Sequence, residues 1–172
     1  MIHRRATASL ALLCALCAAT AHSGPNRYGH SDRVERHMLP GVTTGPVDPA
    51  WSPDGQWLAF SMRGDIWKVS VDGGTALALT RGPAYHFEPA WSPDGSRIAF
   101  SMDIDGNLDI GVVSAEGGAV QRVTEHRAVD VEPTWSRAGE SLYFVSARAG
   151  GFRIFRHDLA TGRDTAIVGG IQ

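Results

Sequence analysis

The string Trp-Ser-Pro-Asp-Gly occurs twice in this chain, at 51–55 and 91–95, and a degraded copy, Trp-Ser-Arg-Ala-Gly, follows at 135–139. The copies recur about every 40 to 45 residues, which is the length of one four-stranded propeller blade. A blade cannot bury both of its faces alone, so such units fold as arrays. The repeat therefore predicts an all-β chain of three four-stranded antiparallel blades. These form an incomplete ring, because closed propellers hold about four to eight blades.

The similarity extends through each copy. Apolar segments follow the turns at equivalent positions, and glycine-containing turns recur at 73–74, 117–118 and 161–162. Apolar runs bounded by turn residues predict strands. We expect an outer strand and loop at 34–47, a first blade at 48–87, a second at 88–131 and a third at 132–172.

The repeated string has the chemistry of a turn between two strands. Its proline presets the first turn position, its aspartate accepts hydrogen bonds from nearby backbone, and its glycine tolerates a left-handed conformation. We interpret the tryptophans as wedges between blades rather than as surfaces that stack on a ligand. The residues with these structural roles are Trp51, Pro53, Asp54, Gly55, Trp91, Pro93, Asp94, Gly95, Trp135 and Gly139.

Residues 1–21 have the pattern of a cleavable signal peptide. Arg4 and Arg5 precede an apolar run at 8–19, and small residues at 19–21 predict cleavage after Ala21. The run is short for a membrane span, so the mature chain is expected to be periplasmic or secreted, without a membrane anchor. Residues 22–33 show no periodicity and are expected to form a flexible lead-in. Both cysteines lie within the signal, so the exported part has no disulfide.

Composition argues against several classes of function. The formal net charge is -2, and basic residues do not cluster, which argues against a nucleic-acid surface. The sequence contains no Gly-x-Ser-x-Gly, His-Glu-x-x-His or His-x-His motif and no glycine-rich phosphate loop. These residues therefore supply no complete catalytic constellation, and no cofactor is expected.

Three carboxylates occupy equivalent positions just before the proline that opens each blade: Asp48, Glu88 and Glu132. In a propeller, these positions lie near one mouth of the central channel. Such a set of carboxylates could bind a cation, an amine or a basic peptide. The alternative is that each carboxylate accepts hydrogen bonds from local backbone groups or pairs with a neighbouring arginine.

His86 and His126 are expected in corresponding loops between blades, close to those carboxylates. A histidine beside a carboxylate can act as a base or as a metal ligand. The sequence offers no third convergent ligand, so we interpret both histidines as loop residues and predict no metal site. Together with the carboxylates, they are the candidate binding residues of the channel mouth.

The segment 103–109 superficially resembles a calcium-binding loop. Leu108 stands where that loop requires glycine, so we predict a hairpin turn instead. The adhesion-like tripeptide at 63–65 aligns with the same hairpin and is assigned the same role.

The repeat contains, in this order, Glu/Asp-Pro-Ala-Trp-Ser-Pro-Asp-Gly, Ile-Ala-Phe-Ser, Asp-Ile, Gly-Gly and Leu/Val-Thr. This order resembles the WD40-like (PD40) blades of the TolB-type β-propeller family, and the resemblance covers residues 34–168. This resemblance implies an exported, non-catalytic segment that serves as a protein-interaction or ligand-channel module. Its partners would be proteins or further propeller blades. Open blade faces expose apolar side chains, so self-association is also expected.

An alternative is that these blades form the front part of a larger periplasmic hydrolase. Residues 39–45 look like the approach to the first blade of exported amidohydrolases, and similar blades gate prolyl-oligopeptidase-like peptidases. The chain ends where the repeat predicts another blade, so a catalytic domain would follow Gln172. This reading rests on fold-level analogy.

Overall fold

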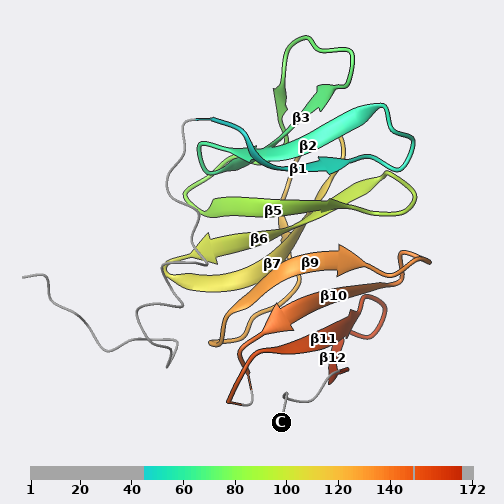
Figure 1. Cartoon of the computed structure of the whole chain (residues 1–172). Coiled ribbons are helices and arrows are strands. Elements are labelled where there is room, and N and C mark those ends of the chain that lie inside the picture. The colour runs from blue at the N-terminus through green and yellow to red at the C-terminus, as the bar shows by residue number, and fades with distance from the viewer. Residues whose placement is uncertain (1–44, 149, 168–172) are drawn as a thin grey trace, which may run out of the picture.

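The computed structural model describes residues 45–148 and 150–167 (Figure 1). Within these ranges every regular element is a β-strand, and no helix has the length and apolarity to cross a membrane. The strands are β1 (Val47–Trp51), β2 (Trp57–Met62), β3 (Asp65–Ser70), β4 (Leu77–Ala78), β5 (Tyr85–Trp91), β6 (Arg97–Ile104), β7 (Asn107–Ser114), β8 (Gln121–Arg122), β9 (Asp130–Trp135), β10 (Ser141–Ser146), β11 (Arg153–Asp158) and β12 (Arg163–Ala166).

The strands form three antiparallel sheets of four, each built from consecutive strands: β1 to β4, β5 to β8 and β9 to β12. The sheets are stacked side by side in an open array (Figure 1). The first strand of each sheet lies next to the first strand of the following sheet. This is the arrangement of propeller blades around an axis, with β1, β5 and β9 innermost, and it confirms the predicted fold class.

The repeated turn joins the first and second strands of each blade. In the first blade, the Ser52 hydroxyl accepts the Trp57 N–H at 2.9 Å and donates to the Asp54 carboxylate at 2.5 Å, and Gly55 has a φ of 69°. The second copy repeats these contacts. In the third copy the Ser141 N–H still donates to the Ser136 hydroxyl at 3.1 Å, although an alanine replaces the aspartate. The serine and the glycine therefore suffice for this turn.

Apolar side chains fill the two interfaces between sheets, which we call the first seam (first and second sheets) and the second seam (second and third sheets). At the first seam Ala59, Ile66 and Leu79 pack against a buried cluster on β6 and β7. At the second seam side chains of β6 and β7 pack against Leu142, Phe144 and Phe155. The middle sheet is thus buried on both faces, which accounts for its nearly continuous apolar strands.

The loop at 103–109 is a hairpin, as predicted. Ile104 pairs with Asn107 across a two-residue turn, and Asp105 and Gly106 have positive φ values of 53° and 80°. The turn after β2 has the same form, with positive φ at Arg63 and Gly64. Positive φ at both central residues matches the right-handed twist of the flanking strands.

Some strand limits differ from the predicted blade limits. The second sheet begins at Tyr85 and the third at Asp130, before the predicted starts at 88 and 132. The predicted signal peptide (1–21), lead-in (22–33) and most of the outer strand and loop (34–47) lie outside the described residues, as does Val168.

Candidate functional site

The three predicted carboxylates lie at the same structural feature of each blade. An extra residue interrupts the pairing of each innermost strand with its neighbour, between Val47 and Ala50 in β1 and at the equivalent places in β5 and β9. At these bulges Asp48, Glu88 and Glu132 have positive φ values of 54°, 55° and 56°. A left-handed conformation is unfavourable for residues with a side chain, and residues in such conformations cluster at functional sites. The three bulges are therefore candidates for a functional site.

The structure brings the three carboxylates together, and we call them the carboxylate row. Asp48 and Glu132 are exposed, and Glu88 is half-buried. Burial raises the pKa of the Glu88 carboxyl, two hydrogen bonds partly offset this, and the negative charges of Glu132 and Asp48 raise the pKa further. Negative charges held close together attract a cationic group.

Glu88 also has a structural role at the second seam. One carboxylate oxygen accepts the Ser101 hydroxyl at 2.6 Å and the Glu132 backbone N–H at 3.0 Å. Ser101 is fully buried, so the bridge ties the second blade to the third from within the interface. The sequence suggests, as one alternative, that each carboxylate accepts hydrogen bonds from local backbone; Glu88 does accept a backbone hydrogen bond, but from the next blade.

The equivalent bridge is not made at the first seam. Ser61 occupies the position of Ser101, and its buried hydroxyl has no hydrogen-bond partner among the described residues. The carboxylate in this blade is Asp48, whose side chain is one methylene shorter than that of glutamate. The bridged seam thus has glutamate at the bulge, and the unbridged seam has the shorter aspartate.

His86 does not lie in a loop at the channel mouth. It lies within β5 and is buried. Its ring and the Phe100 ring pack edge to face, with 5.0 Å between the ring centres. Its Nδ1 lies 3.0 Å from the Thr80 hydroxyl and 3.6 Å from an Asp65 carboxylate oxygen. Burial lowers the pKa of His86, while Asp65 raises it. The side chain therefore joins the interior of the first seam rather than the carboxylate row.

His126 lies in the predicted loop between β8 and β9 and is half-buried. Its Nδ1 accepts the Ala128 N–H at 3.0 Å, and its own backbone N–H donates to the buried Asp109 carboxylate at 3.2 Å. These contacts order the connection between two blades. The two histidines thus occupy different environments, and the structure does not bring them together.

Trp91 and Trp135 lie between blades. The indole Nε1–H of Trp91 donates to the Ala50 carbonyl at 3.1 Å, and that of Trp135 donates to the Ala90 carbonyl at 2.9 Å. Each tryptophan therefore joins its own blade to the preceding one. Trp51 holds the equivalent position in the first blade and is 64% exposed.

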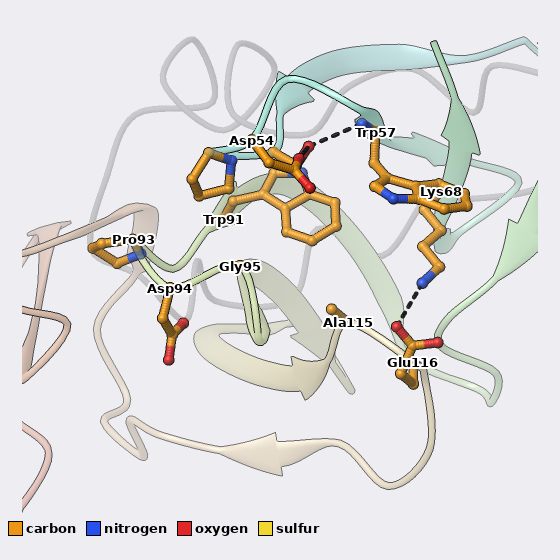
Figure 2. Close-up of a pocket in the computed structure, with 11 residues that line it drawn as sticks. Asp54, Trp57, Lys68, Trp91, Pro93, Asp94, Gly95, Ala115 and Glu116 are labelled. Atoms are coloured by element: carbon orange, nitrogen blue, oxygen red, sulfur yellow. Dashed lines mark hydrogen bonds and ion pairs between the residues drawn. The ribbon is translucent and has the colours of Figure 1, made fainter. Parts of the chain in front are cut away.

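A pocket of about 500 Å³ lies at the first seam, on the side of the Ser-Pro-Asp-Gly turns (Figure 2). In Figure 2 the Trp91 indole lies between Pro93 and Asp94 at one end and Trp57 and Lys68 at the other. Its lining residues are Ser52, Pro53, Asp54, Trp57, Lys68, Trp91, Pro93, Asp94, Gly95, Ala115 and Glu116. Several of these residues belong to the repeated turn for which the sequence predicts a structural role, but nothing in the repeat predicts a pocket here.

A charged cluster in the third sheet was also not identified from sequence. Arg148 pairs with the fully buried Asp130 and, at 2.5 Å, with Asp164, which also contacts His157 Nδ1 at 2.7 Å. Burial raises the pKa of the Asp130 carboxyl, and Arg148 is among the groups that lower it. The guanidinium lies 4.9 Å from the Phe155 ring centre, so the cluster is packed into the blade. Its pairing gives it a structural role.

No group of three or more histidine, cysteine or carboxylate residues within 45–148 and 150–167 is arranged to hold a metal ion.

The family model for the TolB beta propeller domain (PD40) matches residues 42–170, three quarters of the chain. The chain belongs to this TolB β-propeller family. No curated protein matches it. Among solved structures, TolB from Acinetobacter baumannii has 26% identity and a TM-score of 0.64, and the match covers 72% of this chain and 32% of TolB. The chain thus spans well under two thirds of that relative.

The same TolB-type fold occurs in structures of other kinds. A puromycin-hydrolyzing peptidase from Mycobacterium tuberculosis matches with 21% identity and a TM-score of 0.60, over 77% of this chain and 25% of the peptidase. A chain of a nidogen/laminin complex matches with 13% identity and a TM-score of 0.59, over 70% of this chain and 47% of its own length. At these identities the likeness shows the fold alone.

Proposed function

We propose that this chain is an exported, non-catalytic TolB-type propeller segment that binds a basic segment of a partner protein through its carboxylate row. The observation that carries the proposal is the recurrence of a carboxylate at a left-handed bulge in all three innermost strands. Two of these side chains, Asp48 and Glu132, are exposed where a partner can reach them. Clustered carboxylates attract and orient a cationic partner.

The experiment separates the binding role from the structural role of Glu88. The double variant Asp48→Asn with Glu132→Gln removes the two exposed charges and leaves the Glu88 bridge intact. The probe is a lysine-glycine hexapeptide, with affinity measured by calorimetry at low salt. Loss of two nearby charges is expected to weaken binding about tenfold, because each charge contributes about 0.5 to 1 kcal/mol at an exposed site.

The matched control is Glu125→Gln, which removes an 82% exposed carboxylate on the β8–β9 loop. We expect this variant to bind like the parent. An equal loss of affinity in the control would mean that the peptide responds only to the overall charge of the protein. An unchanged affinity in the double variant would refute the carboxylate row as the site. Thermal unfolding of both variants reports whether the fold is retained.

Export is part of the proposal and rests on the signal-like pattern at 1–21. Expression in a Gram-negative host followed by N-terminal sequencing is expected to yield a mature chain that begins at residue 22 in the periplasmic or secreted fraction. A chain that retains Arg4 and Arg5 in the cytoplasm would contradict export.

We further propose that the outer faces of the array mediate association with further blades or with a second copy. Trp51 is 64% exposed on the first sheet, and Ile154 and Ile167 are 42% and 51% exposed on the third. These side chains lie on the open faces of the end blades, and the equivalents of Trp51 and Ile154 in the other blades contact a neighbouring blade. Sedimentation is expected to detect concentration-dependent association, and a monomer at all concentrations would contradict it.

A second candidate function is the propeller part of a larger hydrolase. The likeness to the puromycin-hydrolyzing peptidase, of which this chain spans 25%, favours a peptidase within this alternative. Reading the coding sequence beyond Gln172 tests it. A Gly-x-Ser-x-Gly segment would support a peptidase, His-x-His with further ligands would support an amidohydrolase, and a stop codon after further blades would support the non-catalytic module.

A further inference from the structure

The first-seam pocket has a counterpart at the second seam, and the counterpart is filled. There the Arg97 guanidinium lies 4.6 Å from the centre of the Trp135 ring and donates to the Gly139 carbonyl at 3.4 Å. Trp135 is the repeat equivalent of Trp91, and Gly139 is the equivalent of Gly95. The molecule therefore contains an example of the group that this type of surface accepts.

At the first seam the residue equivalent to Arg97 is Trp57, which has no cationic group to place over Trp91. The cationic residue of the pocket lining is Lys68, whose ammonium lies 4.8 Å from the centre of the Trp57 ring and 3.0 Å from the Glu116 carboxylate. Lys68 is buried and held by these contacts at one end of the pocket (Figure 2). The space beside Trp91 is left open.

The charge of the lining favours a cation. Asp54, Asp94 and Glu116 carry negative charges, and Lys68 carries the single positive charge among the lining residues. Hydrogen bonds from Ser92 and Ser96 lower the pKa of Asp94 to about 2, and a hydrogen bond from Ser52 lowers the pKa of Asp54. The two carboxylates are therefore ionised at neutral pH, and the lining repels an anion.

We propose that this pocket binds a guanidinium group, such as an arginine side chain, stacked on Trp91 and attracted by the surrounding carboxylates. The cavity is large enough for such a side chain, and a cation over an indole face gains from the negative potential of the ring. The site lies on the turn side of the blades and uses none of the residues of the carboxylate row. It therefore holds or fails independently of the function proposed above.

The primary experiment titrates the chain with Nα-acetyl-argininamide and, in parallel, with Nα-acetyl-citrullinamide, which has nearly the same shape without the charge. Indole N–H resonances of Trp57 and Trp91 report binding by NMR. Stacking on one indole together with attraction by the carboxylates is expected to give a Kd of about 1 to 10 mM. The neutral analogue is expected to cause no saturable shift. Equal binding of the two compounds, or no shift with the cation, would overturn the proposal.

Two variants localise the effect. Trp57→Arg places a guanidinium at the position of Arg97 and is expected to abolish binding, because the chain then fills its own pocket. Glu116→Gln removes a carboxylate that is 84% exposed and leaves the Lys68 charge unpaired, so Kd is expected to rise about tenfold. The matched control is Glu125→Gln, which is 82% exposed and also belongs to an ion pair on the second blade.

The Glu116 and Glu125 variants keep the test decisive if Trp57→Arg does not fold. Unchanged binding in Glu116→Gln, or an equal loss in Glu125→Gln, would refute the assignment to this pocket. A third titration, with the blocked tripeptide Gly-Arg-Gly, distinguishes the source of the group. Tighter binding than acetyl-argininamide assigns the site to an arginine within a polypeptide, and weaker binding assigns it to a small guanidine.

Discussion

The two seams are built from the same repeat but are completed to different degrees. Both contain a tryptophan that donates to an alanine carbonyl of the preceding blade. At the second seam a carboxylate also bridges the blades at one end, and a guanidinium covers the tryptophan at the other. At the first seam the Ser61 hydroxyl has no partner among the residues that the structure describes at one end, and a pocket is open at the other.

Single substitutions within the repeat account for both differences. Aspartate replaces glutamate at the bulge, where position 48 corresponds to 88, and tryptophan replaces arginine at the start of the second strand, where position 57 corresponds to 97. The shared tryptophan contact holds the blades together in either case. One position of the repeat can therefore be occupied by its own side chain at one seam and leave a pocket at the other, while both seams keep the same contact between blades.

The largest test of the comparison removes the shared tryptophan from each seam. Trp135→Ala and Trp91→Ala are each expected to lower the free energy of unfolding by about 3 kcal/mol, the low end of the range for large core side chains, because both tryptophans are half-buried. Trp135→Ala should cost about 0.5 to 1 kcal/mol more, because Arg97 loses its stacking partner. Urea unfolding followed by circular dichroism measures both. Trp51→Ala, at a side chain 64% exposed, is the control. An effect of the control as large as the others would contradict the role of tryptophan between blades.

The next test compares the two bulge carboxylates. Glu88→Ala removes the bridge to Ser101 and the Glu132 N–H and is expected to lower the free energy of unfolding by about 1 to 3 kcal/mol. Asp48→Ala removes an exposed side chain that makes no such bridge and leaves alanine at a φ of 54°, so its effect should be smaller, about 0.5 to 1 kcal/mol. The same urea titration applies. Equal effects would mean that the seams do not differ at this end.

Much of the fold was predictable because the repeat shows which positions of the three blades are equivalent. Three copies of one turn fixed the number of blades, the strand order and the hairpins at 63–65 and 103–109. The short outer strands were less accessible to prediction. The hydroxyls of Thr80 and Thr124 accept the N–H groups of Ile66 and Ile110 at 2.9 and 3.0 Å, so a side chain replaces part of the strand ladder where the repeat ends.

The site was predictable only in outline. The proline that follows Asp48, Glu88 and Glu132 marked their equivalence, but the left-handed bulge and the reach of Glu88 to the next blade depend on contacts between blades. The repeat predicts His86 in a loop between blades, close to Glu88. In the structure β5 begins at Tyr85, and the strand carries His86 into the buried seam.

Asp48→Glu should convert the first seam toward the second. The longer side chain can reach the Ser61 hydroxyl and the Glu88 N–H, as Glu88 reaches their equivalents, and is expected to raise the free energy of unfolding by about 0.5 to 1.5 kcal/mol. Urea titration measures the gain. The double variant with Ser61→Ala serves as a cycle, in which most of the gain should disappear. A gain that persists without the hydroxyl would show that the missing bridge is not the relevant difference.

The smallest effect concerns the turns that lead into the second strand at each seam. The turn of the second blade contains Asp94, whose pKa hydrogen bonds from Ser92 and Ser96 lower to about 2, whereas the turn of the third blade has Ala138 at that position. A carboxyl whose pKa is lower in the folded state than in the unfolded state stabilises the fold. This contribution is fully present at pH values above the ordinary pKa of 3.8 and is lost as the pH falls toward 2. Asp94→Asn is therefore expected to flatten the decline of the urea midpoint between these pH values, and Ala138→Asp is expected to steepen it. If the urea midpoint of Asp94→Asn declines with falling pH as steeply as that of the parent, the serine contacts stabilise the turn of the second blade independently of the carboxylate charge.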